Sequence, residues 1–312
     1  MNRRFFVQKN SLLAAGLTLQ PFVPRTSSEG RKFKLCLNPG AIGVSLNQLE
    51  LLNKAKEFGF EAIVGHSGDL LKMDREEIED YAAEMSGSDI SWGATGLSVE
   101  FRQDEITYRE GLEELPLVAR QMEHAGARRM NTWIMPTHAS LTYRANFHQH
   151  KDRIKEMANI LGHYGIKLGL EYVGPKTLMA LRKFSFIRTM AEAKDLLAAI
   201  DEENVGFVLD SFHWHCAGET AADILTLEPT DIVTVDLNDA RTGFTPDEQV
   251  DGQRELPGAT GVIDLKNFVT ALIEMGYDGP IRAEPFNQPL RDMEDDAAIK
   301  ATYDSMMGAI NL

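Results

Sequence analysis

Between residue 33 and the C-terminal end, the sequence alternates a short apolar run with a longer amphipathic stretch eight times. The apolar runs have the length of buried parallel strands, and the longer stretches have the periodicity of helices. No linker-like change of composition separates these units, which predicts an α/β fold with one (β/α)8 barrel over residues 31–312. The expected strands are 33–37, 61–64, 90–94, 130–134, 167–172, 205–209, 232–237 and 280–284.

A doubly wound open sheet also alternates strands with helices and is the alternative to a barrel. That fold usually carries a G-x-G-x-x-G turn after its first strand. The segment in that place, Asn38-Pro-Gly-Ala-Ile-Gly43, does not match the pattern, which favours the barrel. The expected helices are 45–58 with Ser45 as its N-cap, 76–85, 108–125, 146–164, 186–200, 221–226, 265–275 and 292–310.

Residues 1–30 form a separate leader that is similar to a twin-arginine export signal. Arg3 and Arg4 precede an aromatic pair, a moderately apolar stretch covers 11–23, and a polar segment follows. Such signals carry folded proteins across the inner membrane, so this leader predicts a periplasmic protein. A disordered leader with chance arginines, on a cytoplasmic protein, is the alternative. The apolar stretch is too short for stable membrane insertion.

The composition restricts the partners of the chain. Its formal net charge of −15 argues against a nucleic-acid partner, because surfaces that bind a phosphate backbone are basic. The two cysteines, Cys36 and Cys216, make neither a metal-binding spacing nor a disulfide framework. A small molecule is the expected partner, and a homo-oligomer is compatible with the sequence.

Acidic residues stand at the ends of four successive expected strands. In a barrel, catalytic groups gather at the carboxyl ends of the strands. Four converging carboxylates repel one another unless a cation neutralises them, so the pattern predicts a metal site. Four independent capping residues are the alternative, although four successive acidic strand ends seldom arise by chance. The four residues are Glu171, Asp210, Asp236 and Glu284.

Several motifs around these acids resemble a known family. The chain is similar to the sugar isomerase/epimerase branch of the xylose isomerase-like TIM barrels, and most similar to 2-keto-myo-inositol (inosose) isomerases. Ketose 3-epimerases are more distant. The motifs that carry the resemblance are Gly169-Leu-Glu171-Tyr-Val-Gly-Pro, Val208-Leu-Asp210-Ser-Phe-His213, Asp236-Leu-Asn-Asp, Arg254-Glu-Leu-Pro-Gly and Arg282-Ala-Glu284-Pro-Phe.

The resemblance implies a function and a role for each matching residue. The family's members hold a divalent ion by Glu, Asp, His and Glu from these strands, and the two glutamates act as acid and base. Glu171 and Glu284 are therefore expected as ligands and proton-transfer groups, and Asp210 as a ligand. His213 matches a residue that contacts substrate, and Arg254 matches one that contacts substrate or steadies the site. The implied reaction is a 1,2-proton transfer through a metal-bound enediolate on a keto-sugar or keto-inositol.

One position departs from the family pattern, since Asp236 stands where the family usually has histidine. The ligands would then all be oxygen atoms, which favours Mn²⁺ or Mg²⁺ over Zn²⁺. Either the metal preference has shifted, or Asp236 no longer binds metal. In the second case His215 or Asn238 is a candidate for the missing ligand.

Three other functions remain open from the sequence. The same proton abstraction could end in β-elimination, giving a lyase or hydrolase that acts on 3-keto-glycosides. A barrel in which Asp236 has abolished metal binding would be a non-catalytic sugar-binding protein. An endonuclease for abasic DNA, from the same barrel superfamily, is disfavoured by the acidic composition. Arg282 and Lys266 are poor candidates for binding a phosphate near the last strands, which favours an unphosphorylated substrate.

Some further side chains have a functional and a structural interpretation. His66 and His138 either line the pocket or are structural, and Trp92 and Trp133 either stack on a sugar ring or pack internally. The acidic segment 244–255 is either a lid over the mouth or a surface loop. Three residues are expected on the surface: His148, His150 and Lys176.

Overall fold

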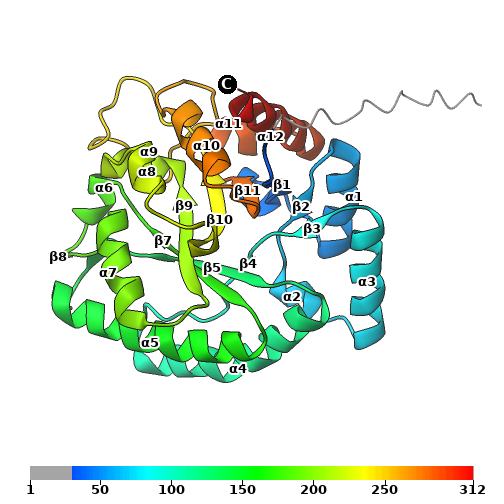
Figure 1. The fold of residues 1–312 in the computed structure, drawn as a ribbon, viewed down its shortest axis with the longest axis horizontal. Coiled ribbons are helices and arrows are strands. Elements are labelled where there is room, and N and C mark those ends of the chain that lie inside the picture. Colours follow the sequence, from blue (N-terminus) through cyan, green and yellow to red (C-terminus); the bar gives the residue numbers. More distant parts are fainter. Residues whose placement is uncertain (1–29, 312) are drawn as a thin grey trace, which may run out of the picture.

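The computed structural model describes residues 30–311, whose central sheet contains nine parallel strand segments in the order β3-β2-β1-β11-β10-β9-β7-β5-β4. The two ends of this order, β3 and β4, are consecutive segments of one extended stretch. The sheet therefore closes on itself as a (β/α)8 barrel, which confirms the expected fold (Figure 1). The segments are β1 (Lys34–Leu37), β2 (Ala62–Ile63), β3 (Ser91–Trp92), β4 (Thr95–Gly96), β5 (Arg129–Ile134), β7 (Lys167–Tyr172), β9 (Val205–Asp210), β10 (Ile232–Leu237) and β11 (Pro280–Ala283).

The third barrel strand differs from the expectation because it is divided. β3 pairs only with β2 and β4 only with β5, and the stretch between them contains Gly93. A Cβ at this glycine would lie 2.5 Å from Cys36 Sγ in β1, so only glycine permits the close passage of the chain. Cys36 and Cys216 are both free and buried.

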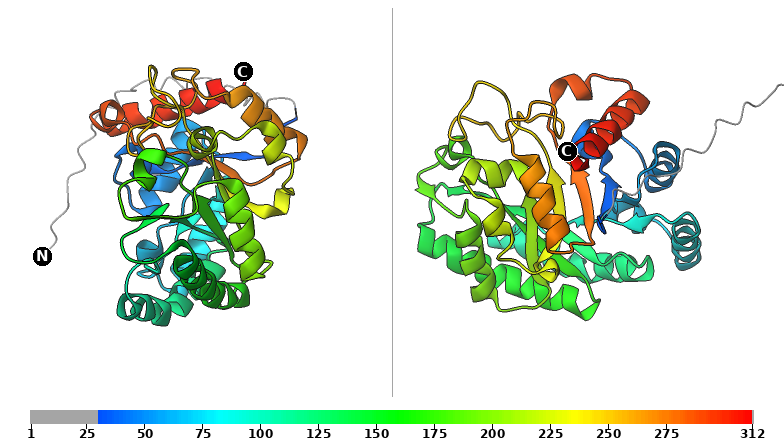
Figure 2. Two further views of the ribbon diagram at one scale, coloured as in Figure 1. Left: turned by 90° about the vertical axis from the view of Figure 1, so that its left-hand side faces the viewer. Right: turned by 45° about the horizontal axis from the view of Figure 1, so that its top comes forward.

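Helices surround the barrel on its outer side (Figure 2). Each long helix turns an apolar stripe inwards; α4, for example, buries Tyr108, Leu112, Leu115 and Val118 at helical spacing. The long helices are α1 (Gln48–Phe58), α3 (Arg75–Gly87), α4 (Glu105–His124), α5 (Tyr143–His163), α7 (Met190–Ile200), α10 (Leu265–Glu274) and α12 (Asp295–Ile310). Short elements occupy the connections: η1 (Pro39–Ile42), α2 (Ser67–Leu70), β6 (Thr137–His138), α6 (Lys176–Met179), β8 (Phe184–Ser185), α8 (Ser211–Ala217), α9 (Ala221–Ile224), η2 (Pro229–Asp231) and α11 (Gln288–Arg291).

Several helix starts were predicted wrongly. The N-cap of α1 is Asn47, not Ser45, because the Asn47 side chain accepts from the backbone N–H groups of Leu49 and Glu50. Asp104 caps α4 in the same way, one turn before the expected start, since the apolar periodicity begins only after the capping turn. α7 begins later than expected, at Met190, because Thr189 is its N-cap.

The export leader lies almost entirely outside the described residues, so the leader and its periplasmic destination stay predictions. Within residues 30–311, no helix combines the length and the apolar character needed to cross a membrane.

Candidate metal and active site

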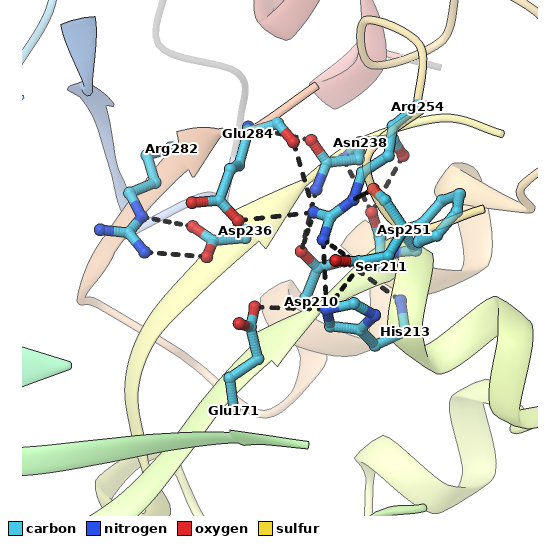
Figure 3. Close-up of polar contacts among 11 residues, drawn as sticks. Glu171, Asp210, Ser211, His213, Asp236, Asn238, Asp251, Arg254, Arg282 and Glu284 are labelled. Atoms are coloured by element: carbon cyan, nitrogen blue, oxygen red, sulfur yellow. Dashed lines mark hydrogen bonds and ion pairs between the residues drawn. The ribbon is translucent and has the colours of Figure 1, made fainter. Parts of the chain in front are cut away.

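Four acidic side chains converge at the carboxyl ends of four neighbouring strands. Glu171 belongs to β7, Asp210 ends β9, Asp236 lies in β10 and Glu284 follows β11. One carboxylate oxygen from each lies within 4.8 Å of the others (Figure 3). The fold thus brings together all four acids that the sequence singled out.

Asp210 is held at the junction of a strand and a helix. Its Oδ1 accepts from the backbone N–H groups of Phe212 (2.6 Å) and His213 (3.2 Å), and so caps α8. Its Oδ2 accepts from Arg254 Nη1 and Asn238 Nδ2, each at 2.9 Å. The carboxylate is therefore fully engaged, and it fixes the start of the helix that carries His213.

Arg254 is a buried cation at the centre of the cluster. Besides Asp210, its guanidinium donates to Asp251 Oδ1 (2.8 Å) and lies 3.5 Å from Glu284 Oε2. The rings of Phe212 and Phe286 lie against it, with centroids 4.9 and 4.7 Å from its Cζ. Burial alone would lower the pKa of Arg254, but the surrounding carboxylates raise it, so the residue stays charged.

Asp236 is paired with an arginine on the next strand. It lies opposite Arg282 in the β10–β11 register, and the two form a bidentate salt bridge with N···O distances of 2.5 and 2.9 Å. Both residues are buried. The position where the resembling family has histidine thus holds a carboxylate whose two oxygens are already bound.

Glu171 and Glu284 are less fully compensated. Burial, followed by repulsion from Glu284 and Asp210, raises the pKa of Glu171 well above its usual value. Burial and the neighbouring Asp236 raise the pKa of Glu284 to about 8. In the metal-free protein both carboxyl groups therefore keep their protons to a higher pH than an exposed glutamate does, which suits an acid–base pair.

His213 lies beside this pair. Its Nε2 is 3.7 Å from Glu171 Oε1, and Arg254 Nη2 donates towards it at 3.2 Å. Burial lowers the pKa of His213, so the ring is neutral at neutral pH. A Cβ at Gly174, in the loop after β7, would lie 2.3 Å from the His213 carbonyl oxygen. Glycine at this position therefore lets α8 pack closely against the Glu171 strand.

The two residues considered as replacement ligands have other positions. Asn238 donates to Asp210 and accepts from the Glu284 backbone N–H at 2.9 Å. It therefore links the side chain of Asp210 to the backbone of Glu284. His215 lines a different cavity, together with Thr220 and Asn267. His213 instead forms a second possible ligand set with Glu171 and Asp210.

The cluster's charge and its free donor atom fit a divalent cation. The four strand-end acids and Asp251 surround only two guanidinium groups, so the ionised cluster carries excess negative charge in a buried place. Within the described part of the chain, buried Glu171 Oε1 has no hydrogen-bond partner. Glu171 and Asp210 belong to both possible ligand sets and Glu284 to one, so these three residues would hold a metal ion, with the metal replacing a hydrogen-bond donor on Asp210. Asp236 is the less suitable ligand, because it would have to give up its bidentate salt bridge with Arg282.

Two residues of the cluster were missed from the sequence or given another role. From the sequence, Arg282 was considered only as a phosphate ligand. It stands two positions before Glu284, and residues two positions apart along a strand point to the same face of the sheet. Asp251 precedes Arg254 by three positions, a spacing that local ion pairs often use. These positional signals could have indicated both residues.

The remaining candidates divide between packing and the barrel mouth. Trp92 is internal, since its Nε1 donates to the Ala125 carbonyl at 2.7 Å. Trp133 is 37% exposed and lines a cavity with His138. His66 lies 3.7 Å from Asp69, away from the carboxylate cluster. In segment 244–255, Asp247 forms a salt bridge with Lys176 at 2.7 Å.

Comparison with known proteins now identifies the family. The model of a family described as xylose isomerase-like TIM barrel matches residues 52–306. The chain belongs to the xylose isomerase-like TIM barrel family. This confirms the resemblance drawn from the sequence motifs.

Two relatives are similar to this chain at low identity, and both are named inosose isomerase. The protein from Halalkalibacterium halodurans is 29% identical over 164 residues, which cover 51% of this chain and 53% of that protein. The protein from Bacillus velezensis is 24% identical over 284 residues, covering 89% of this chain and 97% of that protein. The chain thus spans about half the length of the first relative and almost all of the second.

Solved structures share the fold. A xylose isomerase domain protein from Alicyclobacillus acidocaldarius superposes with a TM-score of 0.78 and 28% identity, covering 89% of this chain and 98% of that one. A structure described as IOLI protein with a binding zinc atom gives a TM-score of 0.75 at 23% identity, again covering 89% and 98%.

The raised carboxyl pKa values predict that the metal-free protein loses stability between about pH 6.5 and 8. Glu171 and Glu284 stay protonated in the folded state at a pH where the unfolded chain has released those protons, so folding weakens as pH rises. Buried His150 and His213 have lowered pKa values and act in the opposite direction, but above pH 6.5 less than half of the histidine in the unfolded chain is charged, so their effect there is small. Urea unfolding in EDTA at pH 6.5 and 8.5 checks this.

The Glu284→Gln variant is the control for this pH dependence, because it removes one of the two groups. Its unfolding midpoint should change less over the same interval. A wild-type midpoint that rises with pH would contradict the expectation.

Proposed function

We propose that this protein is a divalent-metal-dependent isomerase or epimerase of a keto-sugar or keto-inositol. The observation that carries the proposal is the pair of buried Glu171 and partly buried Glu284, both with raised pKa values, in one cluster beside neutral His213. The family and the names of the two inosose isomerases support the same reaction class.

The reaction needs two proton transfers. One glutamate, as carboxylate, takes the proton from the carbon next to the ketone; the C–H electron pair becomes a C=C bond and the carbonyl pair moves onto oxygen. For an epimerisation, the second glutamate, as carboxylic acid, then delivers a proton to the opposite face of the same carbon. For an isomerisation it protonates the former carbonyl carbon, while the neighbouring hydroxyl passes its proton to the enolate oxygen and becomes the new carbonyl. A divalent cation, when bound by Glu171, Asp210 and Glu284, supplies positive charge beside the oxygens on which negative charge develops.

The chain's other polar groups orient the reactants. Arg254 stays charged and holds Asp210, Asp251 and Glu284 in place, so the acids keep their positions as protons move. Neutral His213 is placed to hydrogen-bond a substrate hydroxyl. Because the cluster is buried, few waters compete for the reacting oxygens.

The decisive experiment follows α-proton exchange. Protein stripped with EDTA and reloaded with Mn²⁺ is incubated in D₂O with inososes and ketoses, and NMR measures deuterium uptake at the carbon next to the ketone. Uptake that requires both protein and metal supports the proposal. Absence of uptake across the whole panel would sink it.

We further propose Mn²⁺ or Mg²⁺ as the metal, because the four strand-end acids offer only oxygen. The alternative set with His213 would suit zinc, the metal in the IOLI structure. The His213→Gln variant should keep its Mn²⁺ affinity within about threefold. A loss of roughly tenfold or more, measured by calorimetry, would assign His213 as a ligand instead.

The lyase alternative keeps the same proton abstraction and acts on 3-keto-glycosides. The cavity beside Trp133 is the reason to retain this alternative, because it has room for the leaving group of a glycoside. Product analysis separates the two reactions, since an isomerase cannot release a free aglycone. The non-catalytic alternative predicts protein that purifies without metal and binds none on titration.

We propose export to the periplasm by the twin-arginine route, on the strength of Arg3, Arg4 and the apolar stretch after them. Replacing both arginines by lysine should retain the protein in the cytoplasm on cell fractionation. An unchanged distribution would contradict this route.

A further inference from the structure

A cavity with a largely apolar lining and a few polar groups lies at the end of β5, the strand beside that of Glu171. Its volume is about 180 Å³, which is room for several water molecules. Its lining includes Arg102, Trp133, His138, Asn146, His150 and Arg182. None of the proposed ligands or proton-transfer groups is among its lining residues.

Trp133 connects the cavity with the reaction site. It lies opposite Glu171 in the β5–β7 register, so the two residues are on the same side of adjacent strands, whose backbones are roughly 5 Å apart. Asn131, two positions earlier, lies 3.4 Å from Arg282 Nη1, which places this side of β5 inside the barrel. Trp133 therefore stands at the barrel mouth, between the cavity and Glu171.

The floor of the cavity offers two buried acceptors. His150 Nδ1 lies 2.9 Å from the Asn146 carbonyl oxygen, which can only accept, so Nδ1 carries the proton and Nε2 presents a lone pair. Burial lowers the pKa of His150 to about 4, which keeps the ring neutral. Within residues 30–311, neither His150 Nε2 nor Asn146 Oδ1 has a hydrogen-bond partner, although both are buried. His150, expected on the surface, is thus a buried group that needs a donor.

The rim of the cavity carries two arginines, of which Arg102 is paired with an acid. Arg102 stacks on the Trp133 ring, with its Cζ 4.3 Å from the centroid, and donates to Glu100 Oε2 at 2.8 Å. His138 Nδ1 accepts from two backbone N–H groups, so its Nε2 bears the proton in the neutral ring. Arg182 is exposed. The cavity thus combines an aromatic platform, two buried acceptors and a rim of donors.

We propose that this cavity binds the uncharged, hydroxyl-bearing part of the substrate that extends beyond the reacting carbons. Its hydroxyl groups donate to His150 Nε2 and Asn146 Oδ1, and its carbon skeleton lies against Trp133. A fully ionised phosphate has no proton to donate to these two buried acceptors, so a hydroxyl group and not a phosphate group occupies this part of the cavity. The assignment of this ligand as substrate rests on the proposed function; the cavity's preference for a neutral polyol does not.

Binding is tested apart from the reaction, with the full chain in EDTA. Saturation-transfer NMR measures the affinity for myo-inositol and for a myo-inositol monophosphate. We expect myo-inositol to bind more tightly than the phosphate. His150→Leu should weaken myo-inositol binding about threefold to tenfold, whereas His150→Gln, which keeps an acceptor, should retain it. Trp133→Ala should also weaken it, and this partly exposed position gives a second variant should His150→Leu fail to fold.

The Glu171→Gln variant locates the bound polyol. Binding that persists in this variant and falls in Trp133→Ala supports the cavity as the site. Binding that is lost in Glu171→Gln and unchanged in the His150 and Trp133 variants overturns the proposal, as does tighter binding of the phosphate. The deuterium-exchange result is independent of these outcomes, so failure of the cavity and failure of the proposed reaction are distinguished.

Discussion

The Glu171→Gln variant should lower the rate of α-proton exchange by about 10²–10⁴-fold at saturating metal. Glutamine keeps the shape of the side chain but neither takes nor delivers a proton. Glu284→Gln should have a similar effect, and the double variant should be little worse than either single variant, because the two groups act in one reaction cycle. Deuterium exchange followed by NMR measures all three rates.

Asp247→Asn is the matched control for these variants. It also removes one carboxylate, but from an exposed salt bridge with Lys176. Its exchange rate should stay within about twofold of the wild-type rate. A Glu171→Gln protein that binds metal and exchanges protons at the wild-type rate would remove Glu171 from the mechanism.

Arg282→Met should destabilise the metal-free protein by about 3–5 kcal/mol, because it leaves Asp236 buried without its partner. The double variant Asp236→Leu/Arg282→Met should be more stable than Arg282→Met alone, since it removes both charges together. Urea unfolding in EDTA gives the free energies of unfolding for this comparison.

Arg75→Met serves as the surface control, because the Arg75 side chain is 76% exposed and pairs with Glu79 on the same helix face. The free energy of unfolding of this variant should be nearly unchanged. Equal losses in Arg282→Met and in the double variant would show that the pair stabilises the fold by packing rather than by charge.

The strands were predictable because each is an apolar run bounded by polar residues. Their order and closure followed from the repeated unit, and the acids at their ends followed from the periodicity. Helix starts were less predictable, since the cap of α1 depends on which of two nearby polar residues, Ser45 or Asn47, reaches the free N–H groups. The third strand is divided at Gly93, whose close contact with Cys36 in β1 is not predictable from the local sequence.

The four acids of the site were predictable, but the way their charges are balanced was not. The partner of Asp236 lies 46 residues away, and only the β10–β11 register brings Arg282 opposite to it. His150 was expected on the surface because it stands near a helix start, yet its side chain is buried on the inner face of α5, against the rings of Phe101 and Phe186. In both cases the deciding contact is between residues distant in the sequence.

The Asp236–Arg282 pair also restricts how a lineage can move between aspartate and histidine at this position. A change to histidine alone leaves the buried arginine without its carboxylate, and loss of the arginine first leaves the carboxylate without its cation. Either order passes through an ancestor with a weakened fold, unless a stabilising change elsewhere precedes it. Relatives with aspartate here should therefore retain the arginine two positions before their last acidic ligand, and relatives with histidine should be free to lose it.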